Sequence, residues 1–171
     1  MRIALLGAES TGKTHLCADL AAHLRLQGKS VAVVPEVLRE WCQREGRTPR
    51  PEEQMAIAQE QESRVDAAKA NAQVVIADTT ALMVAIYSAM LFEDCSLYQF
   101  ALARQRGYDL TLLTGLDLPW VADGLQREGP HVREPVDAMI RAALARSGID
   151  YRVVYGSGPE RLANALAAIA K

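Results

Sequence analysis

The chain has 171 residues, enough for one domain with a buried core. Its 19 basic and 21 acidic residues give a net charge of −2, which excludes a generally basic surface for nucleic acid or membranes. Cys17, Cys42 and Cys95 are widely spaced, which excludes a disulfide framework and a Cys-x-x-Cys zinc site. We therefore expect a single domain over residues 1–171 of a reduced, cytoplasmic protein, with no nucleic-acid or membrane partner.

The first predicted elements are a strand, a glycine-rich loop and a helix. Residues 3–6 are an apolar run typical of a buried parallel strand. Residues 7–14 read Gly-Ala-Glu-Ser-Thr-Gly-Lys-Thr, a complete match to G-x-x-x-x-G-K-[ST]. Leucines recur every four residues from Leu16, which predicts a helix that Gly28 ends. This order is the context that a phosphate-binding loop needs, so we expect nucleoside triphosphate binding.

Each part of this loop has a physical role in holding a triphosphate. Gly7 and Gly12 let the backbone wrap closely, so that N–H groups and the positive end of the helix face the phosphates. Lys13 is expected to reach the β and γ phosphates, and the Thr14 hydroxyl to bind Mg²⁺. The three histidines have no spacing that predicts a metal site or a catalytic triad. The predicted ATP-binding residues of this segment are Gly7, Ser10, Thr11, Gly12, Lys13, Thr14 and His15.

Short runs of Val, Ile and Leu alternate with helical stretches through the rest of the chain. Four further strands are predicted at 31–34, 74–77, 110–113 and 152–155. Helices are predicted at about 52–71, through Val136 to Leu144 with Gly148 closing it, and through Leu162 to Ile169, while 43–51 reads as an exposed loop. The alternation predicts an α/β three-layer sandwich, a five-stranded parallel sheet with helices on both faces. Ligands of such a sheet gather at the carboxyl ends of its strands.

Two carboxylates directly follow predicted strands. Asp78 can bind Mg²⁺ directly or through water, or it can cap the next helix in competition with Thr79 and Thr80. Glu36 can take a proton from a substrate hydroxyl, hold a ribose diol, or face the helix dipole as a first-turn acid. We expect both carboxylates to serve in catalysis and substrate binding.

Arginines and tryptophans are the next candidates for substrate contacts. Arg127 and Arg133 flank a loop with glycine and proline, and each can either meet the transferring phosphoryl group or belong to a solvated basic turn. Arg39 can bind substrate or pair with Glu36, one helical turn away. Trp120 and Trp41 can each stack a flat ring, although core or hinge packing is the favoured interpretation for either one alone. Which of the two stacks stays open, and Trp120 is included among the expected substrate contacts.

Gly156 and Pro159 follow the last predicted strand. Backbone groups in this segment can approach an adenine edge, although a plain strand-to-helix turn predicts the same residues. We include both among the expected ATP contacts.

Four stretches together resemble the ribosylnicotinamide kinase domain of the NadR type, a family of small P-loop kinases that phosphorylate nicotinamide riboside. They are residues 7–14, 36–41, 77–79 and 119–125, which read GAESTGKT, EVLREW, ADT and PWVADGL. The resemblance implies ATP-dependent phosphoryl transfer to the 5′-hydroxyl of nicotinamide riboside, a strand order of 2-3-1-4-5, and a lid at about 117–134. By position it implies that Lys13 and Thr14 hold ATP and Mg²⁺, that Asp78 and Glu36 serve the metal and substrate hydroxyls, and that Arg127 belongs to the lid.

The chain departs from this family on the acceptor side. Val37 stands where an aromatic residue is usual, and Thr80 where a second acid is usual. A kinase for another nucleoside or for a nucleoside monophosphate is an alternative, and a monophosphate would need a pair such as Arg39 with Arg104 or Arg106. A nucleotide-dependent switch or ATPase acting through a protein partner is another alternative, and a homo-oligomer stays open. No adenylyltransferase or helix-turn-helix segment is visible, so we expect neither activity.

Overall fold

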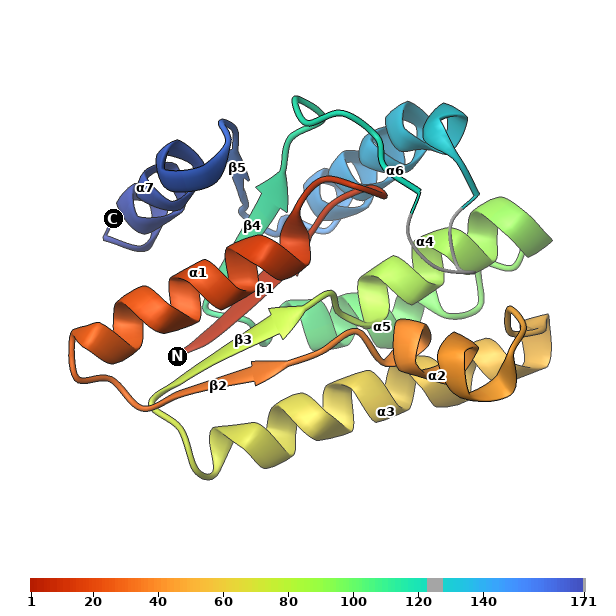
Figure 1. Ribbon diagram of the computed structural model, residues 1–171. Coiled ribbons are helices and arrows are strands. Elements are labelled where there is room, and N and C mark those ends of the chain that lie inside the picture. The colour runs from red at the N-terminus through yellow and green to blue at the C-terminus, as the bar shows by residue number, and fades with distance from the viewer. Residues whose placement is uncertain (123–127, 171) are drawn as a thin grey trace.

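The computed structural model describes residues 1–122 and 128–170. Its centre is one sheet of five parallel strands in the order β2-β3-β1-β4-β5 (Figure 1), which confirms the predicted fold class and strand order. The strands are β1 (Arg2–Leu6), β2 (Val31–Val34), β3 (Val74–Asp78), β4 (Leu110–Thr114) and β5 (Arg152–Val154). The helices are α1 (Lys13–Leu26), α2 (Val37–Glu45), α3 (Pro51–Lys69), α4 (Ala81–Phe92), α5 (Tyr98–Gln105), α6 (Arg133–Arg146) and α7 (Gly158–Ile169), with a 3-10 turn η1 (Pro130–Val132) before α6.

Helices cover both faces of the sheet. On one face, Ile3 and Leu5 of β1 pack with Leu16 of α1 and with residues of α7. On the other face, Leu6 of β1 packs with residues of α4 and α6, and Val65 of α3 packs with β2 and β3. The side chains of β1 are therefore buried on both faces, the pattern of a central strand in a parallel sheet. This arrangement leaves the edge at the strand ends for ligands.

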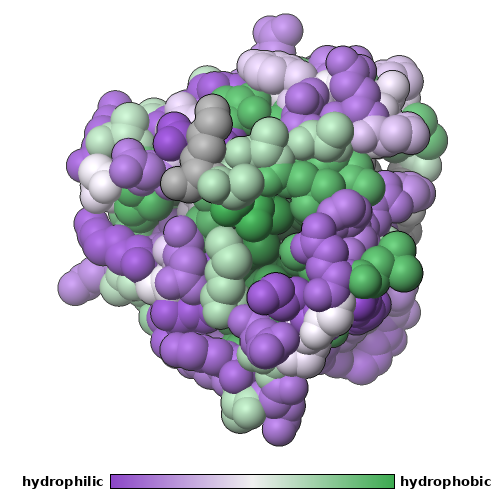
Figure 2. All heavy atoms as spheres, turned by 90° about the vertical axis from the view of Figure 1, so that its left-hand side faces the viewer, coloured by the Kyte–Doolittle hydropathy of each residue, from purple (hydrophilic) through white to green (hydrophobic). Residues whose placement is uncertain are grey.

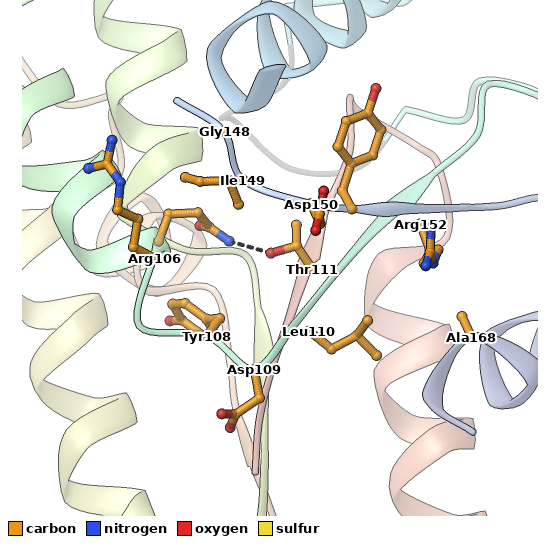
Figure 3. A pocket seen from close by; sticks show the side chains of 12 residues that line it. Arg106, Tyr108, Asp109, Leu110, Thr111, Gly148, Ile149, Asp150, Arg152 and Ala168 are labelled. Carbon is orange, nitrogen blue, oxygen red and sulfur yellow. Dashed lines mark hydrogen bonds between the residues drawn. The ribbon is translucent and has the colours of Figure 1, made fainter. Parts of the chain in front are cut away.

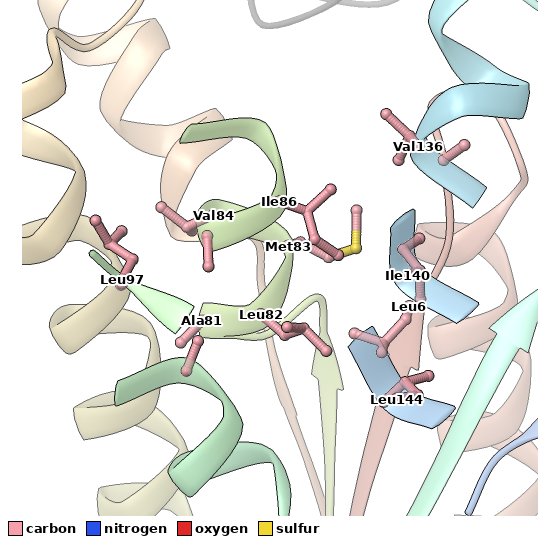
Figure 4. Packing of buried hydrophobic residues seen from close by; sticks show 14 of the residues in the cluster. Leu6, Ala81, Leu82, Met83, Val84, Ile86, Leu97, Val136, Ile140 and Leu144 are labelled. Carbon is pink, nitrogen blue, oxygen red and sulfur yellow. The ribbon is translucent and has the colours of Figure 1, made fainter. Parts of the chain in front are cut away.

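The first half of α4 is apolar on all sides because other helices surround it. Its residues 81–86 are each at most 5% exposed. Figure 4 shows these side chains between Leu97 on one side and Val136 and Ile140 of α6 on the other. An all-round apolar helix is expected where protein covers every side. Of the helices in the described parts of the chain, none is long and apolar enough to cross a membrane.

The prediction of an exposed loop at 43–51 is wrong for both ends of that segment. The helix α2 continues through Gln43 to Glu45 and ends where Gly46 takes a φ of 68°. Pro49 is buried, and Pro51 begins α3, where its missing N–H removes no helical hydrogen bond. The charged residues that, together with Gly46, Pro49 and Pro51, indicated a loop include Arg44 and Glu45, which are exposed in the last turn of α2.

The connection between α2 and α3 is held by Glu53. Its carboxylate accepts hydrogen bonds from the Arg47 guanidinium at 2.7 and 2.8 Å and from the backbone N–H of Arg50 at 2.7 Å. These hydrogen bonds, the Arg47 one foremost, lower the pKa of Glu53 to about 2. The ionised carboxylate therefore fixes the segment that carries Thr48 and Pro49.

Replacing Glu53 by glutamine is expected to make the free energy of unfolding less dependent on pH between about pH 7 and 3. Because the pKa of Glu53 is lowered in the folded state, its carboxylate stabilises the fold above pH 4.5, and this contribution is lost as the pH falls toward about 2. Glu53→Gln should therefore be less stable than the wild type near neutral pH, and the difference in free energy of unfolding should shrink in acid. Urea unfolding at about pH 7, 4 and 3 measures this, with the exposed Glu52→Gln as control. A difference that stays constant over this range would contradict the assigned role.

Candidate active site

The carboxyl ends of β1 and β3 form the candidate active site. Residues 7–12 follow β1 directly and turn into α1 at Lys13. Gly7 has a φ of 152°, and a Cβ there would lie 2.1 Å from Oγ1 of Thr114, the last residue of β4. Gly12 has a φ of 74° at the start of the helix. Glycine at both positions lets the loop close around a small space in front of α1, as phosphate binding requires.

The Lys13 ammonium lies inside this loop. Lys13 is 8% exposed, and its Nζ donates hydrogen bonds to the carbonyl oxygens of Gly7 at 2.9 Å and Ala8 at 2.8 Å. A phosphate oxygen is a stronger partner for an ammonium group than a neutral carbonyl is. The loop therefore holds its cation where a triphosphate would recruit it.

Arg161 of α7 supports the loop from behind, and the sequence analysis did not single it out. The guanidinium is buried; Nη1 donates to the carbonyl oxygen of Thr11, Nη2 pairs with Asp117 at 2.7 Å, and Nε donates to the carbonyl oxygen of Gly156 at 2.7 Å. One side chain thus joins the phosphate loop to the segments after β4 and β5. Its sequence signal is weak, because an arginine near a helix start is ordinarily exposed.

Thr14 and Asp78 form a candidate magnesium site. The Thr14 hydroxyl donates to Oδ2 of Asp78 at 2.5 Å, and Asp78 is 3% exposed. Its other oxygen, Oδ1, is buried and has no hydrogen-bond partner among the described residues. An unpartnered buried carboxylate oxygen is costly, and carboxylate and hydroxyl oxygens are donors that Mg²⁺ prefers. The pair therefore fits Mg²⁺.

A magnesium site beside a triphosphate needs few protein ligands. Within residues 1–122 and 128–170, no group of three or more His, Cys, Asp or Glu side chains could hold a metal ion. Mg²⁺ in nucleotide sites uses one or two protein oxygens and takes its other ligands from phosphates and water. A site with Thr14 and Asp78 alone is sufficient for that mode of binding.

Thr80, and not Asp78, caps the N-terminus of α4. The Thr80 hydroxyl accepts a hydrogen bond from the N–H of Leu82 at 3.3 Å and donates one to Gln105 at 2.7 Å. Thr79 has a φ of 76°, a conformation that β-branched residues rarely adopt. This sharp turn separates the two roles, since Asp78 contacts α1 while Thr80 caps α4.

Glu36 and Arg39 contact each other at the start of α2. The Nε of Arg39 lies 3.3 Å from Oε2 of Glu36, so the ion pair considered for Arg39 is present. The Glu36 side chain is 12% exposed and the Arg39 side chain 24%. Both also line cavities next to the phosphate loop. The pair therefore lies in the interior of the candidate site.

Three cavities follow one another from the phosphate loop to α4. The loop cavity, of about 560 Å³, is lined by residues 10–15, Arg39, Leu118, Pro119, Val121 and Ala122. The aromatic cavity, of about 230 Å³, is lined by Glu36, Leu38, Thr48, Pro49, Gln54, Tyr87, Leu91, Phe92 and Glu128. A gap of about 20 Å³ has a lining that includes Lys13 from the first and Glu36 and Tyr87 from the second. The two larger cavities therefore share a junction at Lys13 and Glu36.

Tyr87 and Phe92 of α4 supply the rings of the aromatic cavity. Neither tryptophan is among its lining residues. The Arg47 guanidinium lies 4.8 Å from the centre of the Trp41 ring, and the Trp120 indole donates to Glu9 at 3.5 Å. The sequence analysis missed Tyr87 and Phe92, although they are the aromatic residues of the apolar run 81–92.

The arginines of the expected lid segment are placed in part. Arg127 and residues 123–125 of the resembling motif lie outside the described residues. Arg133 begins α6, and its Nη2 donates to the carbonyl oxygens of Leu118 at 2.7 Å and Leu116 at 3.4 Å. These contacts hold the chain that follows β4.

The loop after β5 lies at the other end of the phosphate loop. The N–H of Gly156 donates to Asp117 at 2.6 Å, and Pro159 is exposed in the first turn of α7. A cavity of about 260 Å³ adjoins the loop cavity here, and its lining includes His15 and Gly158. It offers room for the base of a nucleotide, next to but not lined by Gly156 and Pro159.

The arginine pair that a monophosphate acceptor would need is not assembled. Arg104 pairs with Asp66 at 2.5 Å and with Glu62 at 3.5 Å. Arg106 lines a separate cavity of about 340 Å³, together with Asp109 at the beginning of β4 (Figure 3). This cavity lies on the side of the molecule where the strands begin, and Figure 2 shows that side with hydrophobic residues at its centre. Arg39, in contrast to Arg106, lines the loop cavity at the opposite ends of the strands.

Two cysteines near the site are held as neutral thiols. Burial and then the charge of Asp78 raise the pKa of the Cys17 thiol well above its ordinary value. Burial and then the charge of Glu36 raise the pKa of Cys42. A reactive cysteine needs the opposite shift, so neither thiol is suited to act as a nucleophile.

These features define a P-loop nucleotide-binding domain. A family model described as AAA domain matches residues 2–161, so the chain belongs to that family. No curated protein matches the chain.

Solved structures of other proteins share the fold. The crystal structure of NadR protein in complex with NR matches with a TM-score of 0.78 at 21% identity, over 98% of this chain and 48% of that chain. Deoxyadenosine kinase from M. mycoides matches in two structures, one with the products dCMP and a flexible dCDP and one with dCTP. Their TM-scores are 0.64 and 0.60 at 15% and 13% identity, over 99% of this chain and 98% and 99% of those chains. The chain thus spans about half of the NadR chain and nearly all of the deoxyadenosine kinase chains.

Proposed function

We propose that the protein is an ATP-dependent nucleoside kinase that converts nicotinamide riboside to nicotinamide mononucleotide. The observation that carries this proposal is the junction between the loop cavity and the aromatic cavity, where Lys13 and Glu36 line the same gap. A triphosphate on the loop and a nucleoside in the aromatic cavity would meet there, between a cation and a carboxylate. Phosphoryl transfer depends on such positioning and charge neutralisation more than on covalent chemistry.

The aromatic cavity suits a nucleoside better than a nucleotide. Its lining includes the carboxylates of Glu36 and Glu128, and no lysine or arginine of the described residues lines it. Two carboxylates would repel a phosphate dianion, whereas they attract a cation, as do the faces of Tyr87 and Phe92. The nicotinamide ring of the riboside is cationic. The solved NadR complex with NR supports this acceptor, and the fold shared with deoxyadenosine kinase keeps another nucleoside as the second candidate.

Each residue of the site has a role in the proposed transfer. The loop N–H groups and Lys13 bind the β and γ phosphates, and Thr14 and Asp78 would hold Mg²⁺, which neutralises phosphate charge. The oxygen of the acceptor hydroxyl forms a bond to the γ-phosphorus while the bond from that phosphorus to ADP breaks. Glu36 accepts the proton that the hydroxyl loses. Arg39 orients Glu36 through their ion pair. The products are the mononucleotide and ADP.

The proposal includes a cellular setting. Cys17, Cys42 and Cys95 are all free thiols, which suits a reducing, cytoplasmic compartment. A small-molecule nucleoside is the only partner that the proposed reaction requires besides Mg²⁺-ATP.

ADP production across a panel of acceptors tests the proposal. The panel contains nicotinamide riboside, adenosine, deoxyadenosine, cytidine and their monophosphates, each with Mg²⁺-ATP. We expect nicotinamide riboside to raise ADP production at least about tenfold over the acceptor-free rate, and the monophosphates to leave it unchanged. A preference for a neutral nucleoside would contradict the charge argument but not the kinase. Turnover that no acceptor raises would favour a nucleotide-dependent switch with a protein partner.

A further inference from the structure

Glu9, the third residue of the phosphate loop, is a buried acid for which the proposed transfer has no role. It is 0% exposed. Oε1 accepts a hydrogen bond from the N–H of Glu128 at 2.7 Å, and Oε2 accepts one from the N–H of Gly129 at 3.1 Å. The Trp120 indole N–H approaches Oε2 at 3.5 Å, the outer limit of a hydrogen bond. Two separate stretches of the chain thus converge on one carboxylate.

The backbone at Gly129 is shaped for this contact. Its φ of 121° is rarely adopted by residues with a side chain, and a Cβ there would lie 3.1 Å from Nδ1 of His131. Two consecutive N–H groups reach one carboxylate as a result. Such backbone concavities bind anions, and here the anion is the protein's own Glu9.

Ser10 makes a second contact between the phosphate loop and the same part of the chain. Its hydroxyl donates to the carbonyl oxygen of Val121 at 2.6 Å and accepts from the N–H of Val121 at 2.9 Å. Ser10 has a φ of 54°, an unusual conformation for a residue with a side chain. Glu9 and Ser10 together fasten residues 120–121 and 128–129 to the loop.

We propose that Glu9 is a positioning residue that sets the separation between the triphosphate and the acceptor. The phosphate loop lines the loop cavity, and Glu128 lines the aromatic cavity. The hydrogen bond from Glu128 to Glu9 therefore connects a residue that lines the aromatic cavity to the phosphate loop, which lines the loop cavity. The inference rests on the proposed function, because it gives the aromatic cavity to the acceptor. Small errors in such a separation are costly, since the acceptor oxygen must lie within about 3.5 Å of the γ-phosphorus and in line with the bond that breaks.

The Glu9→Gln variant tests this role with little change in side-chain volume. Glutamine offers one acceptor oxygen, and its NH₂ group faces the N–H of either Glu128 or Gly129, so one of the two hydrogen bonds is lost. We expect kcat to fall about tenfold and KM for nicotinamide riboside to rise about tenfold, with KM for ATP within about twofold of the wild type. The exposed Glu52→Gln is the matched control and should leave all three values unchanged.

Amide hydrogen exchange gives a second readout that needs no acceptor. Exchange at Glu128 and Gly129 in the full chain is expected to be about tenfold faster in Glu9→Gln than in the wild type, and unchanged in Glu52→Gln. This measurement stands even if nicotinamide riboside is not a substrate. It therefore separates failure of the Glu9 contact from failure of the proposed function.

Faster exchange together with the kinetic split between the two substrates supports the proposal. Unchanged exchange would overturn it, as would faster exchange with unchanged kcat and acceptor KM, because Glu9 would then serve the fold alone. If Glu9→Gln does not fold, Glu9→Asp replaces it, since its carboxylate is one methylene too short to keep both bonds, and the same kinetic split is expected. A wild type that phosphorylates no nucleoside would overturn both the proposed function and this role of Glu9.

Discussion

Replacing Lys13 by alanine is expected to lower kcat/KM for phosphoryl transfer by about 1,000-fold or more. The Lys13 ammonium is the cation inside the phosphate loop, and it lines the gap where the two cavities meet. Alanine removes the charge that would neutralise the β and γ phosphates during transfer. Coupled measurement of ADP at saturating Mg²⁺, with nicotinamide riboside as acceptor, gives the change in kcat/KM.

The fold of the Lys13→Ala variant should survive. Its ammonium donates to two loop carbonyls, so the loss of stability should be about 1–3 kcal/mol. Circular dichroism and thermal unfolding measure this directly. Lys29→Ala, at an exposed position beyond α1, is the control and should match the wild type. Global unfolding of Lys13→Ala would refute its placement in a ligand site.

Replacing Asp78 by asparagine is expected to reduce kcat by about 100-fold and to raise the Mg²⁺ concentration needed for half-maximal activity. The buried Oδ1 of Asp78 has no hydrogen-bond partner among the described residues, and the neutral amide oxygen of asparagine is a poorer magnesium ligand than a carboxylate. Asparagine keeps the size of the side chain and an acceptor for the Thr14 hydroxyl. Magnesium titrations at fixed ATP measure the shift.

The matched comparison for Asp78→Asn is Glu36→Gln. Glu36 lies in the aromatic cavity and beside Arg39, so its loss should lower kcat with little change in Mg²⁺ dependence. Equal shifts in Mg²⁺ dependence for the two variants would show that the division of roles between the carboxylates is wrong.

Local sequence patterns were sufficient to predict the strands of the sheet and the phosphate loop. The strand order followed from the family resemblance, while the strands themselves follow from short apolar runs whose residues are buried on both faces. The loop at 7–14 is readable because its chemistry is contiguous in the chain, and helix ends at Gly28 and Gly148 are marked by glycines with φ of 79° and 62°.

Contacts between distant residues could not be predicted from the same patterns. Arg161 contacts Thr11 across 150 residues, and Glu9 contacts Gly129 across 120. Each looks like an ordinary surface charge in the sequence, because most of its partners are backbone groups with no side-chain signature and its side-chain partner, Asp117 or Trp120, is distant in the chain. Tyr87 and Phe92 were hidden for a different reason, since both belong to an apolar run that core packing alone explains. The prediction for segment 43–51 was wrong at its ends because glycine and proline also mark helix ends: Gly46 ends α2 and Pro51 begins α3.

Following a label on the γ-phosphoryl group of ATP tests the central claim most directly. With γ-labelled ATP, Mg²⁺ and nicotinamide riboside, we expect the label to appear on nicotinamide mononucleotide in step with ADP, and to stay on ATP with the Lys13→Ala variant. Label that is released only as inorganic phosphate, or that stays on ATP with the wild type for every nucleoside offered, would contradict the assignment of this site to a nucleoside kinase.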